Sequence, residues 1–381
     1  MKLKDPGNRD SQNEDRVQPA HQQASWPVSG PVFVTGVWRS GTSLLYALLN
    51  RHPEIGLFYE GDLPVLRPMF KVGYSRKNWL RRWEYWNAGV SRHGLDPARL
   101  PVAPTSLAEA AEAAGREYCR KKGASLWGCK SPSYYDRLVE LADDFPRARF
   151  IIIWRDPEEI CRSVADAAAH SRWFAGSGMM HRAILACETL KKQFDALVSR
   201  GVPVHQIHYK ELVGDTTTTM RGICEFLEIP FVPAVTSLEG ADRSAVFGGA
   251  HHSKVKGTRI VSSRDREATL SPGLEKKIQR YEALWKAENG TEWMLSRYLP
   301  EGGGPTPSAW ERLTDSLFFS LLRLKDEAPR VAFSVLPMWV WRLYRLVKYR
   351  DPAFAKDHNR AFIDDPMPKK RQQIIANQQD T

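Results

Sequence analysis

The sequence predicts an α/β protein with a doubly wound parallel sheet. Short strand-like runs alternate with helical segments across residues 31–228, which is the pattern of repeated β–α–β units. The run Phe150–Trp154 is apolar throughout and rich in β-branched residues, as expected of a parallel strand that is covered on both faces. A glycine loop between the first strand and the first helix adds a P-loop-like turn suited to an anion. We therefore expect one sheet with helices on both of its faces.

Local signals set the limits of each element. The first helix stops before Pro53, and the helix 106–122 ends in two lysines and a glycine, as helices commonly do. Pro146 and Pro230 end two further helices in the same way. The predicted strands are 31–34, 54–62, 126–130, 150–154 and 202–209, and the predicted helices are 42–49, 106–122, 133–144, 158–169, 181–200, 216–228 and 272–289.

Composition divides the 381 residues into three parts. Residues 1–26 are polar and offer almost nothing to bury, so we expect a disordered tail. Residues 27–300 carry the alternating pattern and form the predicted α/β domain. Composition changes again after a run of glycines, and residues 301–381 form a predicted C-terminal helical extension.

The extension is predicted to contain amphipathic helices. Apolar residues recur at helical spacing at Trp310, Leu313, Leu317, Phe318, Leu321 and Leu324. The stretch 338–350 then mixes tryptophans with arginines and a lysine. Basic helices with tryptophans bind anionic membrane surfaces, so residues 305–350 are a candidate membrane contact. Docking on the body of the protein, or on a second subunit of a homo-oligomer, is the alternative.

Charge and cysteine content narrow the function classes. The formal charge of +11 fits an anionic ligand, nucleic acid or acidic lipid, but the basic residues are scattered, which argues against nucleic acid. The five cysteines show no C-x-x-C pair and no zinc spacing, so we expect buried free thiols and no metal. The odd count and a polar start without an apolar leader predict a cytoplasmic protein, peripheral to the membrane at most.

The glycine loop 36–43 is the first functional motif. Gly36 and Gly41 have the spacing of a Walker A loop, but Thr42 stands where a P-loop NTPase has lysine. The positive charge sits inside the loop on Arg39, where a guanidinium can clamp a terminal anionic group. Hydroxyl donors are added by Ser40, Thr42 and Ser43. An ordinary glycine turn before a helix is the alternative interpretation.

A second motif follows the strand 150–154. Arg155 stands at the strand end, and Ser163 lies eight residues further on, about two turns into the next helix. The two side chains can flank one phosphate, with the helix N-terminus contributing to its binding.

Together these motifs resemble those of the sulfotransferase family that uses 3′-phosphoadenosine 5′-phosphosulfate (PAPS), closest to its tyrosylprotein and carbohydrate branches. The likeness covers about residues 30–290. The loop 36–43 resembles the family's 5′-phosphosulfate loop, which implies donor binding by Arg39, Ser40, Gly41, Thr42 and Ser43. Arg155 and Ser163 resemble its 3′-phosphate motif.

The resemblance implies roles for further residues. Glu60 lies 21 residues after Arg39, where the tyrosylprotein branch carries its catalytic glutamate, and Lys130 resembles that branch's Lys-x-Pro lysine. Arg39 would share the catalytic role. Tyr209 resembles a tyrosine that contacts the adenosine. A loop that closes over the nucleotide is matched by the stretch that holds Lys254, Lys256 and Arg259.

The implied activity is transfer of a sulfuryl group from PAPS to an acceptor hydroxyl, with Glu60 as the base. The segment 76–92 is rich in Arg and Trp and can stack on a sugar, or can pack its tryptophans inward, and it suggests a carbohydrate or glycolipid acceptor. Asp62 replaces an arginine of the tyrosylprotein branch, which argues against a peptide acceptor. The alternative bases are His205, His208, His251 and His252. Two other functions remain open: a P-loop-type kinase or nucleotide-binding protein, and a non-enzymatic binding module.

Overall fold

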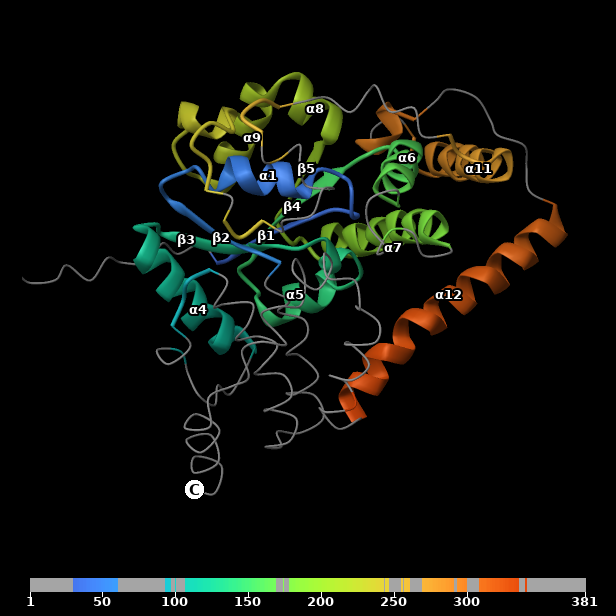
Figure 1. Cartoon of the computed structure of the whole chain (residues 1–381), viewed down its shortest axis with the longest axis horizontal. Coiled ribbons are helices and arrows are strands. Elements are labelled where there is room, and N and C mark those ends of the chain that lie inside the picture. Colours follow the sequence, from blue (N-terminus) through green and yellow to red (C-terminus); the bar gives the residue numbers. More distant parts are fainter. Residues whose placement is uncertain are drawn as a thin grey trace, which may run out of the picture.

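In the computed structural model, five parallel strands form one sheet in the order β2–β3–β1–β4–β5 (Figure 1). The strands are β1 (Val32–Thr35), β2 (Ile55–Tyr59), β3 (Leu126–Lys130), β4 (Arg149–Trp154) and β5 (Val204–His208). The structure describes residues 30–60, 93–96, 100, 107–168, 174, 178–242, 244–246, 255, 257–260, 269–290, 293–299, 308–335 and 340.

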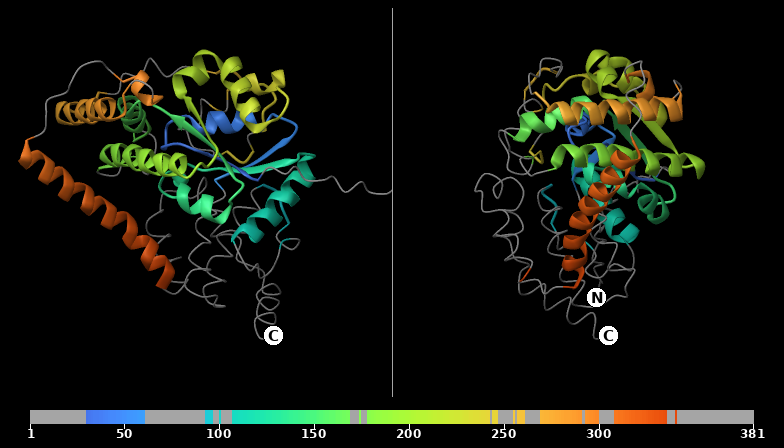
Figure 2. Two further views of the ribbon diagram at one scale, coloured as in Figure 1. Left: turned by 180° about the vertical axis from the view of Figure 1, so that it is seen from behind. Right: turned by 90° about the vertical axis from the view of Figure 1, so that its right-hand side faces the viewer.

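Helices cover both faces of the sheet (Figures 1 and 2). One face packs against α1 (Thr42–Leu49), α8 (Tyr209–Gly214), α9 (Thr216–Leu227) and the 3₁₀ turn η4 (Pro233–Thr236). The other packs against α4 (Leu107–Lys122), η3 (Pro132–Asp136), α5 (Leu138–Asp144), α6 (Pro157–Ala168), α7 (Met179–Ser199) and α11 (Pro272–Asn289), followed by η6 (Leu295–Arg297). The doubly wound parallel sheet is therefore confirmed.

The side chains of β4 show why this strand has no polar face. Ile151 and Ile153 point into the core beneath α1 and α9, whereas Phe150, Ile152 and Trp154 point into the core on the α7 side. Both sets are buried, as the unbroken apolar run predicts.

Parallel pairing brings distant residues to one edge. Val34 pairs with Lys130 and with Ile151, and Tyr59 also pairs with Lys130. All five strands therefore end on the same side, which we call the carboxyl edge. In open α/β sheets ligands bind at this edge, at the point where the strand order reverses. Here that point is beside β1, because the chain goes from β1 to β2 on one side of it and later crosses to β4 on the other side.

Some predicted elements differ from the structure. The predicted strand 54–62 is shorter, since β2 ends at Tyr59 and Glu60 has a positive φ of 51°. The predicted helix 133–144 is split into η3 and α5, because Arg137 between them has non-helical backbone angles (φ −140°, ψ 17°). The predicted strand 202–209 ends at His208, and Tyr209 begins α8 instead. The reason is a capping box: His208 Nδ1 accepts from the Lys210 amide at 3.2 Å, and Glu211 accepts from the His208 amide at 3.0 Å.

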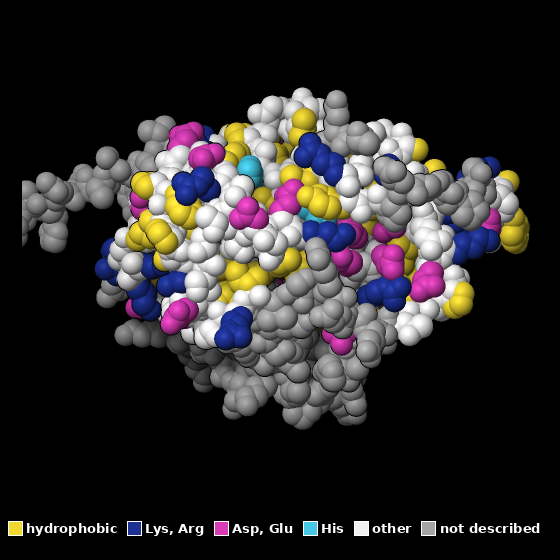
Figure 3. All heavy atoms as spheres, turned by 90° about the horizontal axis from the view of Figure 1, so that it is seen from above, with side chains coloured by type: hydrophobic (Ala, Val, Ile, Leu, Met, Phe, Trp, Pro, Cys, Tyr) yellow, Lys and Arg dark blue, Asp and Glu magenta, His cyan; other side chains and the backbone are white. Residues whose placement is uncertain are grey.

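The cysteine prediction is confirmed, since all five thiols are buried and free. The predicted tail 1–26 and most of 338–350 lie outside the described residues, and the limits 27–300 and 301–381 stay predictions. In the parts that the structure describes, no helix combines the length and apolarity needed to cross a membrane. On the face shown in Figure 3, basic and acidic side chains are interspersed, in keeping with the scattered charge of the sequence.

Candidate active site

The glycine loop lies tightly against neighbouring strands. A Cβ atom on Gly36 would stand 2.5 Å from the Ile153 carbonyl oxygen, so only glycine fits there. Gly41 has a φ of +101°, and a Cβ on it would stand 2.6 Å from the Tyr209 ring. Gly41 is also the N-cap of α1, which has no side-chain cap. The first-turn amides of α1 are therefore left for another acceptor, which is the geometry of an anion site.

Backbone strain is concentrated at two predicted catalytic residues. Among the described residues, three non-glycine residues have positive φ angles, and two of them are Arg39 (71°) and Glu60 (51°). A left-handed conformation costs such a residue about 1–2 kcal/mol. For Glu60 the conformation is held by its amide, which donates to the Lys130 carbonyl at 2.6 Å. Strain of this kind gathers at functional sites, and here it supports the prediction.

Lys130 and Glu60 form an ion pair at the carboxyl edge. The Lys130 side chain is fully buried, and its Nζ lies 2.9 Å from Glu60 Oε1 and 3.3 Å from Ser43 Oγ. It also lies 3.7 Å from the centre of the Tyr59 ring, whose hydroxyl is 3.0 Å from Ser43 Oγ. The ammonium stabilises the ionised carboxylate. Glu60 keeps 22% of its side chain exposed, so its carboxylate reaches solvent beside a buried cation.

Arg155 and Arg39 form a second group around the same loop. Arg155, which is buried, donates from Nη1 to the Arg39 carbonyl at 2.7 Å and from Nε to Glu159 at 3.0 Å. Its guanidinium lies 4.3 Å from the centre of the Tyr209 ring. Arg39 in turn donates from Nε to Ser163 Oγ at 3.0 Å. The structure thus brings together the two motifs, and Ser163 is linked to Arg155 through Arg39.

Asp156, which follows Arg155, is hydrogen-bonded to the end of β5 and the start of α8. Asp156 accepts hydrogen bonds from His208 Nε2 at 3.1 Å and from Lys210 Nζ. Burial raises the pKa of Asp156, but these two partners outweigh burial and hold the pKa below its usual range. The buried His208 ring also stacks on Tyr298, with centroids 3.8 Å apart.

The two strand histidines, His205 and His208, make contacts within the fold, and their roles as alternative bases stay predictions. Because His208 Nδ1 accepts from the Lys210 amide, its proton sits on Nε2 and is donated to Asp156. The ring of His205 stacks on Phe226, and burial lowers its pKa. His251 and His252 lie outside the described residues.

Some predicted contacts are not tested. Lys254 and Lys256 lie outside the described residues, as does the segment 76–92. Arg259 is described and exposed, and its role in closing over a nucleotide stays a prediction.

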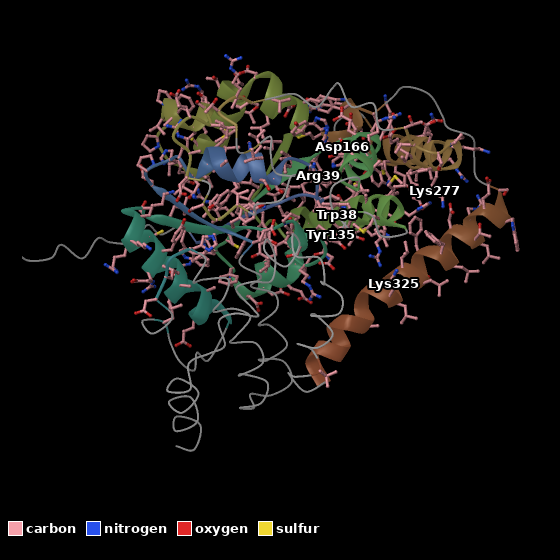
Figure 4. The ribbon with its side chains drawn as sticks, viewed as in Figure 1. Trp38, Arg39, Tyr135, Asp166, Lys277 and Lys325 are labelled. Carbon is pink, nitrogen blue, oxygen red and sulfur yellow. The ribbon has the colours of Figure 1, made fainter. Side chains whose placement is uncertain are left out.

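Sequence analysis missed three residues of the site. Tyr59 contacts both Lys130 and Ser43, and its place at the end of β2 could have indicated it. Glu159 binds Arg155 from one helical turn away, a spacing that the sequence shows. Trp38, beside Arg39 in the loop, meets the Tyr135 ring edge-on with centroids 5.5 Å apart (Figure 4). The approach of Tyr135 depends on η3 and had no local signal.

Comparison with known proteins identifies the family of the chain. The model of the "Sulfotransferase family" matches residues 31–233, more than half of the chain and all five strands. The chain belongs to the sulfotransferase family. Protein-tyrosine sulfotransferase 1 of Danio rerio is 30% identical over 232 residues, covering 59% of this chain and 60% of the relative. Protein-tyrosine sulfotransferase of Drosophila melanogaster is 26% identical over 211 residues, covering 54% and 39%.

The match to these relatives is partial. This sulfotransferase family member spans between about two fifths and three fifths of the length of the two relatives named, 39% and 60%. Among solved structures, the sulfotransferase domain from the curacin biosynthetic pathway has a TM-score of 0.46 at 18% identity, covering 68% of this chain and 98% of that domain.

An acidic residue of α11 is buried against the site. Glu282 has 3% of its surface exposed, and its Oε1 accepts from the Glu158 amide at the start of α6 at 3.3 Å. Within the described part of the chain, its Oε2 has no hydrogen-bond partner. Burial raises the pKa of Glu282 to about 8, and the nearby carboxylates of Asp156 and Glu158 act in the same direction. Glu282 is therefore mostly protonated at neutral pH in the folded protein.

This shift predicts a loss of stability as pH rises. Between 4.5, the ordinary value, and about 8 the folded state holds a proton that the unfolded state has released. The free energy of unfolding should therefore fall with rising pH, by at most about 1.4 kcal/mol per unit from this group. Glu282→Gln removes the proton exchange, so its Tm should change less between pH 5 and pH 8 than that of the wild type. Glu288→Gln, an exposed carboxylate of the same helix, is the control and should keep the wild-type profile.

Proposed function

We propose that the protein transfers a sulfuryl group from PAPS to an acceptor hydroxyl. The observation that carries the proposal is the position of the loop 36–43, which lies between two groups of side chains. Ser43 belongs to the Lys130–Glu60 pair, and Arg39 belongs to the Arg155 group. One loop therefore connects a base-and-cation pair with a cluster of two guanidinium groups.

The residues fit the proposed donor. The first-turn amides of α1, together with the hydroxyls of Ser40, Thr42 and Ser43, would hold the 5′-phosphosulfate. Arg155 and Ser163 would hold the 3′-phosphate, and Tyr209, under the Arg155 guanidinium, would contact the adenosine side. Arg155 is buried, so a phosphate that it binds is largely removed from water, which strengthens the interaction.

The Lys130–Glu60 pair fits the chemistry of the transfer. Glu60 takes the proton of the acceptor hydroxyl while the hydroxyl oxygen forms a bond to sulfur. The bond from sulfur to the bridging phosphate oxygen breaks, and 3′-phosphoadenosine 5′-phosphate leaves. Lys130, with Arg39, stabilises the negative charge that develops on the bridging oxygen. Burial of Lys130 makes its charge more effective than it would be in water.

A carbohydrate or glycolipid hydroxyl is the acceptor that we propose. Support comes from the aromatic and basic segment 76–92 and from Asp62, where the tyrosylprotein branch has an arginine. A protein tyrosine is the second candidate, since the curated relatives named above are protein-tyrosine sulfotransferases. Labelled PAPS offered with glycosides, glycolipids and acidic tyrosine peptides in parallel would identify the class by which product carries the label.

The donor is tested separately from the acceptor. At 100 times its Kd, 3′,5′-adenosine bisphosphate without added metal should stabilise the fold by about 2.7 kcal/mol, raising Tm by about 5 °C. ATP with Mg²⁺ should have a much smaller effect, because the loop carries Thr42 where P-loop NTPases have lysine. Stabilisation by ATP with Mg²⁺ alone would contradict the proposal and favour a P-loop-type kinase.

A further inference from the structure

The outer side of α12 (Ala309–Val335) carries an exposed apolar stripe. Seven large hydrophobic side chains are exposed in the described part of the chain, and five of them lie on α12. They are Trp310, Leu313, Leu317, Leu321 and Leu324, with exposed fractions of 71%, 51%, 57%, 65% and 67%. Their spacing of three or four residues places them on one side of the helix. We call this set the α12 stripe.

The opposite side of α12 is docked on the domain. Phe319 and Leu322 are buried in a cluster with Leu185 of α7, and Phe319 also packs on Tyr281 of α11. Lys277 of α11, which Figure 4 labels, pairs with Asp315 at 2.5 Å. The helix thus already has a packed face, and the α12 stripe is a second apolar face directed away from the body. Figure 2 shows α12 along the outside of the molecule.

The helix carries four basic and four acidic residues, and two of the acidic ones pair with α11. The two acidic residues of its first half, Glu311 and Asp315, face α11 and pair with Arg280 at 3.4 Å and with Lys277. Arg312 and Lys325 are exposed. In sequence, the four other charged residues of the helix are two basic and two acidic. The stretch 338–350 that follows has four basic residues, no acidic residue and two tryptophans. The apolar stripe is therefore followed in sequence by a segment that is apolar and basic together.

We propose that the α12 stripe binds the surface of an anionic lipid bilayer, with the helix lying in the plane of the interface. An apolar row with a tryptophan at its start, followed by basic residues and further tryptophans, is the chemistry that such a surface recognises. A second copy of the chain is the alternative occupant, and the experiment below distinguishes it from a bilayer. This inference does not rest on the proposed activity. Binding of α12 to a bilayer would place the candidate active site next to amphiphilic acceptors.

The test uses the full chain and vesicles of phosphatidylcholine with or without phosphatidylserine. We expect co-sedimentation with the phosphatidylserine vesicles, weakened by salt, and weak binding to phosphatidylcholine alone. Leu317→Ser with Leu321→Ser should reduce the partition coefficient by at least about 10-fold, because two apolar side chains no longer enter the interface. The control is Val198→Ser with Leu284→Ser, two exposed apolar residues outside α12, which should bind as the wild type does. Tm should be nearly unchanged in both double variants, since all four side chains are exposed.

Three results would overturn the proposal. The wild type could fail to bind the phosphatidylserine vesicles. The Leu317 and Leu321 double variant could bind as well as the wild type, which would assign binding to other residues. The same variant could change the sedimentation coefficient from that of a dimer to that of a monomer without altering vesicle binding, which would make the α12 stripe an interface between copies.

Discussion

Glu60→Gln is expected to lower the rate of sulfuryl transfer by about 100-fold or more, as for other general bases. Glutamine has nearly the same shape, and its carbonyl oxygen can still accept from Lys130, whose Nζ lies 2.9 Å from the present carboxylate. The buried ammonium therefore keeps a partner, and the fold and the binding of the donor should change little. What is lost is the ability to take a proton, so the effect should fall on kcat.

The measurement is single-turnover transfer from labelled PAPS to whichever acceptor yields product with the wild type. Glu54→Gln is a matched control, because Glu54 precedes β2 at the opposite end of the strand from Glu60. Thermal stabilisation by 3′,5′-adenosine bisphosphate should be the same in the wild type and in the Glu60→Gln and Glu54→Gln variants. If the Glu60→Gln variant keeps full activity, the base lies elsewhere, although the donor site would still stand.

Much of the site could be predicted because parallel strands end at a common edge. Glu60 follows β2, Lys130 ends β3 and Arg155 follows β4, so identifying the strands was enough to bring these residues together. The position of the glycine loop could also be predicted, from its two glycines. Gly36 and Gly41 stand where a Cβ atom would collide with Ile153 or Tyr209, and such close approaches leave a clear mark in sequence.

The contacts between the side chains could not be predicted. The bond from Arg39 to Ser163 depends on the positive φ of Arg39 and on its rotamer, and neither is a local property of the sequence. The burial and protonation of Glu282 could not be predicted from the sequence either. Glu282 reaches the start of α6 from α11, more than 120 residues further along the chain, and only tertiary packing makes it buried and protonated.

Arg155→Ala is expected to weaken binding of 3′,5′-adenosine bisphosphate by about 10- to 100-fold, the range for a lost charge-assisted hydrogen bond. Arg155→Lys should recover only part of the affinity, because lysine keeps the charge but loses the planar fork of donors. Arg162→Ala is the control: Arg162 lies on α6, the helix that follows Arg155, pairs with Glu158 and Glu275, and should leave affinity unchanged.

Arg155 also supports the glycine loop through the Arg39 carbonyl, so a loss of affinity alone would not assign its role. Calorimetry with adenosine 5′-phosphate separates the two effects, since this ligand lacks the 3′-phosphate. If Arg155 binds that phosphate, the variant should lose affinity for the bisphosphate and lose little for the monophosphate. An equal loss for both ligands would show that the guanidinium acts by holding the loop, and the 3′-phosphate would then need another partner, with Ser163 and Arg39 the nearest candidates.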